Sequence, residues 1–364
     1  MKTSKSLYIH VPFCRHICGY CDFVKVGYHQ ELADKVLDRI IEDLSNQKGP
    51  FKSIYIGGGT PSALTIEQLL RLKDAIAPFL DSAQEVTMEL NPETMDEEKV
   101  ITLVKMGINR VSVGVQAIQP HLLTTLTRKH SYDDALKVIA WLRKHNINNI
   151  SVDAMYGIKD QTLEDFKETL DAFIDAEVDH VSLYALTIEE NTPFYAQHVQ
   201  PVDNELEGLF YECAHNTLKK AGYDHYEVSS FTKNNKRSIH NTGYWKYEDF
   251  IGVGPGAASK IGCKRTINTK NIHHYLIKQH LLFEEVDLQP LDCLFEHLMM
   301  GLRLNEPLDL NDLSQKFDVH VLNLYQEAIQ HGIDQQWLTL NGMLLKTTYH
   351  GRLFLHDVLM LFMK

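Results

Sequence analysis

The stretch Cys14-Arg-His-Ile-Cys18-Gly-Tyr-Cys21 directly follows the apolar run Leu7-Tyr-Ile-His-Val-Pro-Phe13. Three thiols spaced C-x3-C-x2-C in one short segment can converge on a single metal centre. A mononuclear zinc site would need a fourth ligand close by. A [4Fe–4S] cluster held by three thiolates instead leaves one iron open to a small ligand. The plainer alternative is a helix stripe packed in a core, but Pro12 and Gly19 disfavour a regular helix. We therefore interpret this segment as an iron–sulfur cluster site.

The composition is that of an ordinary globular protein: 364 residues, 44% hydrophobic and 23% charged. A chain of this length exceeds one core's comfortable size, so we expect one large and one small domain. The net charge of −12 disfavours broad binding to nucleic acid or anionic membranes. No apolar run reaches the roughly 18 residues of a membrane-spanning helix, and the N-terminus lacks signal-peptide features.

The remaining cysteines show no motif spacing. Six cysteines in so long a chain are not a disulfide framework, which favours a reducing cytoplasm. Cys213, Cys263 and Cys293 are therefore expected to be isolated, buried structural thiols.

Over residues 7–221, short β-branched runs alternate with longer segments of helical periodicity. Six β-α units predict a parallel sheet with helices outside it, either an open doubly wound sheet or an incomplete barrel. Thr65, Ser131 and Thr162 carry helix-start signals. The expected strands are 7–11, 53–56, 86–90, 110–115, 149–154 and 180–186, and the expected helices are 30–47, 65–80, 96–106, 131–146, 162–176 and 203–221.

Each apolar run ends in residues unlike its interior. In barrel-like folds the active site lies at the carboxyl ends of the strands, so six such ends on one rim would make a site. The glycines of Gly57-Gly-Gly-Thr-Pro61 let the backbone approach a ligand, although this is neither a dinucleotide fingerprint nor a phosphate loop. The ends in question are the cysteine loop, residues 57–61, Glu89, Gln116, Asp153 and Tyr184.

After about residue 222 the alternation stops. Residues 226–230 can form a further strand, and His240-Asn-Thr-Gly-Tyr-Trp245 leads into the glycine-rich segment 252–256. Asn341-Gly342 between alternating apolar residues is a strong hairpin signal. We expect a first domain over 1–284 and a small winged-helix-like domain over 285–364, with helices near 291–303, 309–317 and 320–331. This second domain is not notably basic, which favours packing over nucleic-acid binding.

Eight ordered segments carry a resemblance to a known family. They are Tyr8–Cys14, Gly57–Ser62, Glu89–Pro92, Asn109–Gln116, Asp153–Gly157, Val181–Thr187, His240–Trp245 and Met300–Arg303. Together they resemble the HemN/HemW group of radical S-adenosylmethionine (SAM) proteins over nearly the whole chain. The resemblance implies an α/β fold: a partial (β/α)6 radical SAM barrel that carries a [4Fe–4S] cluster and SAM, plus a small C-terminal domain.

Motif position within that family implies the cofactor residues. Cys14, Cys18 and Cys21 would hold the cluster, whose open iron takes the amino and carboxylate groups of SAM. The glycine-rich element would contact the methionine end of SAM, the two strand-end carboxylates its ribose, and Gln116 with Arg128 its carboxylate. The full set of implied SAM contacts is Tyr8, Tyr20, Gly58, Gly59, Thr60, Glu89, Gln116, Arg128, Asp153, Ala185 and Ala258.

Phe23 separates two branches of the family. The coproporphyrinogen III dehydrogenases carry a fourth cysteine at this place and an N-terminal extension, which this chain lacks before Tyr8. Cys21-Asp-Phe23 and H-N-x-x-Y-W are typical of the HemW branch, regarded as haem chaperones, in which the motif's histidine is implicated in holding haem. The implied haem residues are thus His240, Tyr244 and Trp245. Without the resemblance, His240 would be interpreted as a turn histidine that bonds the backbone.

The resemblance therefore implies a haem chaperone that passes haem to an acceptor protein. The alternatives are oxidative decarboxylation of coproporphyrinogen III through a 5′-deoxyadenosyl radical, and a DNA-binding protein with a structural metal site. No catalytic residue is assigned from the sequence. Two departures affect the rim of the site: Lys159-Asp160 stands where relatives read Pro-Gly, and Ala258 stands near the place of a common histidine.

Overall fold

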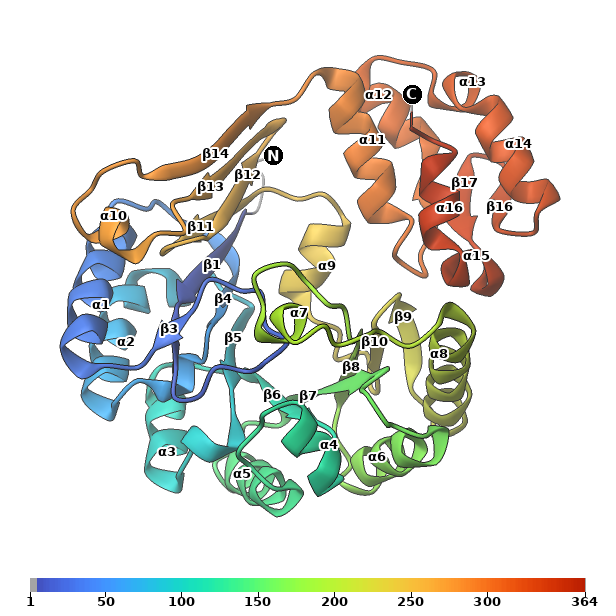
Figure 1. The fold of residues 1–364 in the computed structure, drawn as a ribbon. Coiled ribbons are helices and arrows are strands. Elements are labelled where there is room, and N and C mark those ends of the chain that lie inside the picture. The colour runs from blue at the N-terminus through green and yellow to red at the C-terminus, as the bar shows by residue number, and fades with distance from the viewer. Residues whose placement is uncertain (1–4, 364) are drawn as a thin grey trace.

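The computed structural model describes residues 5–363 and has one curved sheet at its centre. The order of its strands is β14-β13-β12-β11-β1-β4-β5-β6-β7-β8-β10-β9. In Figure 1 this sheet bends into an open crescent with helices on its outer side, so the predicted partial barrel is confirmed and a flat doubly wound sheet is not. Its parallel strands are β1 (Lys5–Val11), β4 (Phe51–Gly58), β5 (Glu85–Leu90), β6 (Arg110–Gln116), β7 (Asn149–Tyr156) and β8 (His180–Ala185), with β11 (Phe250–Val253) parallel to β1.

The helices of the outer layer match the predicted segments. Capping boxes begin three of them, at Thr65, Ser131 and Thr162, and each such cap contributes about 1 kcal/mol to stability. Their apolar faces pack on the sheet, as Val36 and Ile40 do in the first helix. These helices are α1 (Gln30–Ser45), α2 (Ile66–Leu80), α3 (Glu97–Lys105), α5 (Tyr132–Lys144), α6 (Leu163–Asp175) and α8 (Asn204–Lys220), with short α4 (Pro120–Thr125), α7 (Pro193–Ala196), η1 (Pro61–Ala63) and η2 (Pro92–Thr94) in the loops.

Beyond residue 222 the chain extends both edges of the sheet and fills its inside. The expected strand 226–230 is two strands, β9 (Asp224–Glu227) and β10 (Ser230–Thr232), which pair antiparallel at one edge. The other edge carries three strands that the sequence did not predict, because their residues show no apolar alternation. These are β12 (Ala258–Ile261), β13 (Lys264–Asn268) and β14 (Leu282–Asp287), with α10 (Ile272–Leu276) between the last two. The helix α9 (Ile239–Trp245) lies within the crescent (Figure 1).

The C-terminal segment forms a second core of its own, which includes Leu294, Leu298 and Leu345. The predicted helices 291–303 and 309–317 and the Asn341-Gly342 hairpin are confirmed, whereas the predicted helix 320–331 is divided at Tyr325 into Val321–Leu324 and Gln326–Asp334. The expected boundary at 284/285 falls inside β14, which pairs with β13, so the change of domain follows Asp287. The elements are α11 (Pro290–Gly301), β15 (Leu308–Asp309), α12 (Leu310–Phe317), α13 (Val321–Leu324), α14 (Gln326–Asp334), β16 (Leu338–Asn341), β17 (Leu344–Thr347), α15 (Tyr349–Leu353) and α16 (Leu355–Met360).

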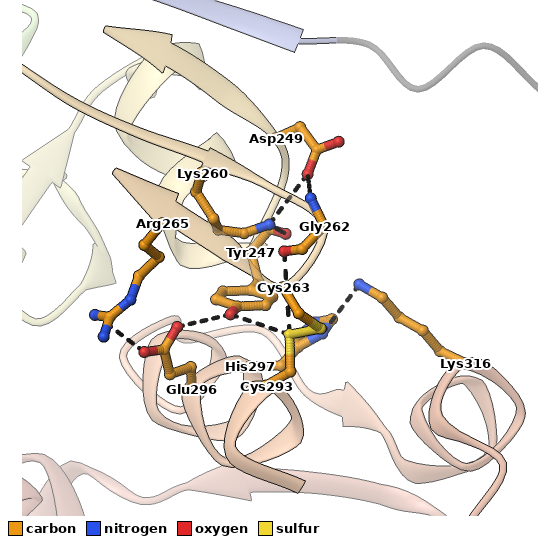
Figure 2. The surroundings of a disulfide bond; sticks show 10 residues. All are labelled: Tyr247, Asp249, Lys260, Gly262, Cys263, Arg265, Cys293, Glu296, His297 and Lys316. Carbon is orange, nitrogen blue, oxygen red and sulfur yellow. Dashed lines mark hydrogen bonds and ion pairs between the residues drawn. A yellow bond between two sulfur atoms is a disulfide. The ribbon is translucent and has the colours of Figure 1, made fainter. Parts of the chain in front are cut away.

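A disulfide joins the two parts of the chain. Cys263, in the turn between β12 and β13, bonds to Cys293 of α11, so the prediction of isolated thiols is wrong for this pair (Figure 2). Tyr247 lies beside it and donates a hydrogen bond of 2.7 Å to Glu296. A pairing across 30 residues without a motif leaves no signal in a single sequence. Cys213 is a free thiol, as predicted, but it is half-buried rather than buried.

We expect replacement of this pair, Cys263→Ser with Cys293→Ala, to lower the free energy of unfolding of the cluster-free protein by about 2–4 kcal/mol. A cross-link that closes a loop of this size restricts the unfolded chain by roughly that amount. Urea unfolding of the oxidised protein, of the protein in excess dithiol, and of the double variant measures the difference. The dithiol should bring the parent protein to the stability of the double variant, and Cys213→Ser should leave the difference unchanged. Equal stability of the oxidised and reduced parent protein would contradict this expectation.

Among residues 5–363, none of the helices is both long and apolar enough to cross a bilayer.

Candidate cofactor site

A cavity of about 330 Å³ opens at the carboxyl ends of the central strands. The cysteine loop and the ends of β4 to β8 all contribute to its wall, so the predicted convergence of strand ends is confirmed. Residues between positions 14 and 185 that are predicted to bind the cluster or SAM therefore line one cavity. The predicted residues that line it are Cys14, Cys18, Cys21, Tyr20, Gly58, Gly59, Thr60, Glu89, Gln116, Arg128, Asp153 and Ala185.

The cysteine loop is fixed at both ends. Strand β2 (Phe13–Cys14) pairs in parallel with β3 (Val26–Gly27), and the backbone N–H of Tyr28 donates to the carbonyl of Cys14 at 2.8 Å. Between these points the N–H of Cys21 donates to the carbonyl of Cys18 at 3.4 Å. The short pairing closes the loop at its base, and the loop holds all three thiols at the cavity.

Each of two thiols has a polar neighbour from another loop, which is the β4 loop for Cys14 and the loop between α4 and α5 for Cys18. Thr60 Oγ1 donates to Cys14 Sγ at 3.5 Å, and Arg128 Nη1 donates to Cys18 Sγ at 3.6 Å. Burial raises the pKa of the Cys14 thiol to about 11 and also raises the pKa of Cys21. Without a metal these two thiols thus stay protonated at neutral pH, and a bound metal would be needed to draw the protons off.

The donor set fits a cluster better than a single ion. Among residues 5–363, no three side chains of His, Cys, Asp or Glu converge closely enough to hold one metal ion. The three thiols nevertheless share one cavity. Thiolates that bind different irons of a cluster need not meet at one point, whereas ligands of a mononuclear zinc must. Three thiols on the wall of one cavity fit the [4Fe–4S] interpretation.

The glycine-rich turn packs directly against the cysteine loop. Gly59 N–H donates to Val11 at 2.9 Å, and Thr60 N–H donates to Phe13 at 2.7 Å. Gly58 has a φ of 113°, and a Cβ there would lie 2.6 Å from the ring of His10. A Cβ on Gly59 would lie 2.8 Å from the backbone of Pro12. Any side chain at these two positions would therefore push the two loops apart.

Two carboxylates lie on either side of β6: Glu89 is next to the end of β5, whereas Asp153, expected at a strand end, lies within β7, which continues to Tyr156. Glu89 accepts hydrogen bonds from the Tyr55 hydroxyl at 2.8 Å and from the N–H of Gly58 at 3.0 Å. Asp153 accepts one from Ser112 Oγ at 3.0 Å. Burial raises the pKa of Glu89 to about 7 and that of Asp153 to about 6. Both groups line the cavity and can accept hydrogen bonds from ligand hydroxyls.

Arg128 is held in place by two further acceptors. Its Nη2 donates to Asn91 Oδ1 at 2.8 Å and to the carbonyl of Gly114 at 2.6 Å. Gln116 ends β6 at a φ of 71°, where the register with β7 shifts. A non-glycine residue in that conformation costs about 1 kcal/mol and is typical of ligand sites. The guanidinium beside Cys18 is thus positioned to meet an anionic group of a ligand.

Two of the implied SAM contacts do not line this cavity. Tyr8 lies in the middle of β1, where its hydroxyl bonds His10 Nδ1 at 2.9 Å and its ring lies 6.5 Å from that of His240. Ala258 lies in β12, opposite Ile267 of β13. A mid-strand residue inside the barrel and one in the edge extension are both removed from the rim, so the structure does not bring them to the other contacts.

The implied haem residues lie on α9, away from the cavity wall. His240 is 1% exposed, Ser53 Oγ bonds its Nδ1 at 2.9 Å, and the Tyr244 hydroxyl bonds its Nε2 at 2.7 Å. Burial lowers the pKa of His240 to about 3, so the ring is neutral. Trp245 is half-buried, with Arg303 5.3 Å from its ring and no hydrogen-bond partner for its buried Nε1. Iron could reach His240 only if one of its two hydrogen bonds opened.

Sequence reasoning missed several residues of the wall. Asn91 donates to Thr60 Oγ1 at 3.2 Å and accepts from Arg128, so it ties the glycine turn to the arginine. Asn91 lies within the family segment Glu89–Pro92, so the resemblance could have indicated it. Tyr184 was noted as a strand end without a role, and Phe23 lines the same cavity with 63% of its surface exposed.

Comparison with known proteins agrees with the architecture. The Radical SAM superfamily model matches residues 8–173, and the HemN C-terminal domain model matches residues 288–354. Heme chaperone HemW of Lactococcus lactis is 34% identical over 348 residues, which cover 93% of this chain and 92% of that protein. Heme chaperone HemW of Escherichia coli is 33% identical over 376 residues, 98% of each chain.

A solved structure with the same fold is coproporphyrinogen III oxidase (HemN) from Escherichia coli. It covers 99% of this chain and 90% of its own, with a TM-score of 0.86 and 21% sequence identity. At that identity the likeness establishes the fold.

Proposed function

The chain belongs to the HemN/HemW family of radical SAM proteins, in its HemW branch, and from this premise we propose that it is a haem chaperone. It would hold a [4Fe–4S] cluster and SAM, bind haem, and deliver haem to an acceptor protein in the cytoplasm. The observation that carries the proposal is the single cavity that joins three thiols to the glycine turn and the two carboxylates. Support for haem comes from the relatives named heme chaperones, which align with this chain along nearly its whole length.

We assign the cofactor contacts by what each side chain can do. Cys14, Cys18 and Cys21 would hold the cluster, and the bound cluster would offer SAM an open iron for its amino and carboxylate groups. The glycine turn leaves room for the methionine part, and Arg128 with Gln116 would hold the carboxylate. Glu89 and Asp153 would accept hydrogen bonds from the ribose, and Tyr20 and Ala185 complete the wall.

The haem proposal concerns the segment His240–Trp245. A neutral imidazole is a suitable axial ligand, and burial keeps His240 neutral. Axial ligation requires α9 to move so that Nε2 leaves the Tyr244 hydroxyl or Nδ1 leaves Ser53. Trp245, whose indole N–H has no partner, would pack on the macrocycle.

The second candidate function is that of a coproporphyrinogen III dehydrogenase. The fold shared with HemN favours it, but at 21% identity it is evidence of fold alone. Phe23 stands where that branch has its fourth cysteine, and its exposed ring cannot bind iron. We therefore rank this activity below the chaperone function.

The two functions are separated by anaerobic measurements on the reconstituted protein. We expect His240→Ala to weaken haem binding at least tenfold in an absorbance titration, because the iron loses its axial ligand, while iron and sulfide contents stay at the parent level. Tyr244→Phe frees Nε2 of His240 and keeps both rings, so this variant should bind haem at least as tightly as the parent protein. An unchanged titration for His240→Ala would place the haem ligand elsewhere. Formation of protoporphyrinogen from coproporphyrinogen III over many turnovers would reverse the ranking.

A further inference from the structure

A second cavity, of about 180 Å³, lies where the barrel meets the C-terminal domain. Helix α8 and strand β9 form one side of it, and Asn305 and helix α15 form the other. It shares no lining residue with the cofactor cavity. Its lining residues are His215, Lys219, Tyr223, Asp224, His225, Asn305, Tyr349 and Arg352.

Arg352 is the central feature of this cavity. The residue is 7% exposed, and its Nη1 donates to the amide oxygen of Asn305 at 3.1 Å. Its Nε is buried and has no hydrogen-bond partner, and within residues 5–363 it forms no ion pair with a carboxylate. A guanidinium buried without a counter-ion is costly, so its surroundings are set to receive an anion. The Tyr349 hydroxyl is likewise buried and has no hydrogen-bond partner in the described part of the chain.

Two histidines complete the same wall. His215 Nδ1 and His225 Nδ1 lie 3.0 Å apart, and His225 Nε2 lies 3.1 Å from the carbonyl of Val228. Since that carbonyl can only accept, His225 carries its proton on Nε2, and its Nδ1 accepts from His215. In this arrangement, protonation of the pair would add a positive charge at His215. Burial lowers the pKa of His215, and the nearby positive charges of Lys219 and Arg352 lower it further.

The charges around the cavity are unbalanced. Lys219 lies on α8 without an ion pair in the described part of the chain. The lining contains one acidic residue, Asp224, whose carboxylate already accepts from Arg237 at 2.9 Å, and the exposed Glu212 of α8 acts on Tyr349 from outside the lining. Charge-assisted hydrogen bonds from an arginine, a lysine and a tyrosine form a set that suits phosphate or carboxylate oxygens.

We propose that this cavity binds a small oxyanion, either a phosphate or the carboxylate group of a small molecule, between α8 and α15. A bound anion would supply Arg352 with its missing counter-ion and would receive a hydrogen bond from Tyr349. Because its ligands come from both domains, it would also strengthen the docking of the C-terminal domain on the barrel. This inference does not depend on the haem or SAM assignments.

Calorimetric titration of the full-length, cluster-free protein with inorganic phosphate at constant ionic strength tests the proposal. We expect saturable binding of one anion per chain and a rise in the unfolding temperature. Lys219→Gln should weaken binding three- to tenfold, and Arg352→Gln should abolish it. Lys220→Gln is the matched control, since this exposed neighbour on α8 does not line the cavity. A parallel titration with acetate separates the two anion classes, and saturable binding of either one supports the site.

Two results would overturn the proposal. One is the absence of saturable binding for both phosphate and acetate. The other is an equal affinity of Lys219→Gln and Lys220→Gln, which would place the anion elsewhere, for instance near Arg128. If Arg352→Gln does not fold, comparison of Lys219→Gln with Lys220→Gln still tests the site. Both lysines are exposed on α8, so neither substitution should prevent folding.

Discussion

Replacement of Cys18 with alanine is expected to reduce the iron and sulfide of the anaerobically reconstituted protein from about four atoms each per chain to nearly none, and to remove its brown colour. The cluster would depend on three thiolates from one loop, and two thiolates rarely retain it. The variant should fold, because Cys18 is half-buried and its recorded side-chain contacts are with groups of the cavity. Iron and sulfide analysis with the absorbance spectrum measures the loss.

The matched control is Cys213→Ala. This cysteine is also a half-buried free thiol, but it lies on α8 and does not line the cavity. Its loss should leave the iron content unchanged. A full complement of iron in Cys18→Ala would remove the basis of the cluster assignment, and a stoichiometric zinc content in the parent protein would favour the mononuclear alternative.

The barrel could be predicted because parallel strands impose regular constraints on the sequence. Every residue of β6 is buried, and Val111, Val113 and Val115 alternate along it with small or polar residues. Caps such as that of Thr162 mark the helix starts between the strands. Since the carboxyl ends of parallel strands meet at one edge, Glu89 and Asp153 could be assigned to one site without coordinates.

The distance of a side chain from the rim of the barrel could not be predicted in the same way. Tyr8 and Glu89 are both strand residues that alignment with a family motif would make equal candidates, yet Tyr8 lies below the rim and Glu89 on it. The buried position of His240 follows from the path of α9 into the crescent, which depends on contacts with β4 and on Glu85, which accepts the N–H of His240 at 3.0 Å. Such long-range contacts have no periodic signature.

The same reasoning explains the other omissions. The disulfide joins a turn to a helix of another domain, and the second cavity is built from residues 215 to 352. Strands β12 to β14 lack the apolar alternation of a half-buried sheet. Tertiary contacts of this kind appear only in a three-dimensional structure.

Tyr55 connects the cofactor cavity to the segment proposed for haem. Its hydroxyl donates to Glu89, and its ring lies 5.0 Å from the ring of His240. A movement of α9 that frees His240 would therefore change the packing around Tyr55 and with it one hydrogen bond of Glu89. Occupancy of the two sites can be coupled through this one side chain, since a hydrogen bond lost by a buried carboxylate affects its affinity for a ligand hydroxyl.

Replacement of Glu89 with glutamine is expected to weaken SAM binding by about 10- to 100-fold and, in the cluster-free protein, to increase stability at pH 8. A hydrogen bond to a charged acceptor contributes about 1.5–3 kcal/mol, which corresponds to that loss of affinity. The amide can still accept from the N–H of Gly58 and donate to the oxygen of the Tyr55 hydroxyl, but the Tyr55 proton loses its acceptor, which offsets part of the gain in stability.

The gain in stability follows from the sign of the pKa shift. Burial raises the pKa of Glu89 from about 4.5 to about 7 in the folded protein, so the folded state binds the proton more tightly than the unfolded chain. The parent protein is then most stable, with respect to this group, below the unfolded pKa and loses stability as the pH rises through about 7. Glutamine cannot ionise, so the variant avoids a cost of up to about 3 kcal/mol at pH 8.

Urea unfolding at pH 5 and pH 8 measures this effect, and calorimetry of the cluster-loaded protein measures SAM affinity. We expect the free energy of unfolding to fall less between pH 5 and pH 8 in Glu89→Gln than in the parent protein. Glu98→Gln, an exposed glutamate on α3, serves as the control and should change neither quantity. An unchanged SAM affinity together with a stability no higher than that of the parent protein at pH 8 would show that Glu89 is neither a buried charge nor a ligand. The strand-end carboxylate is costly in the empty protein, and a ligand hydroxyl in the cavity would offset part of that cost.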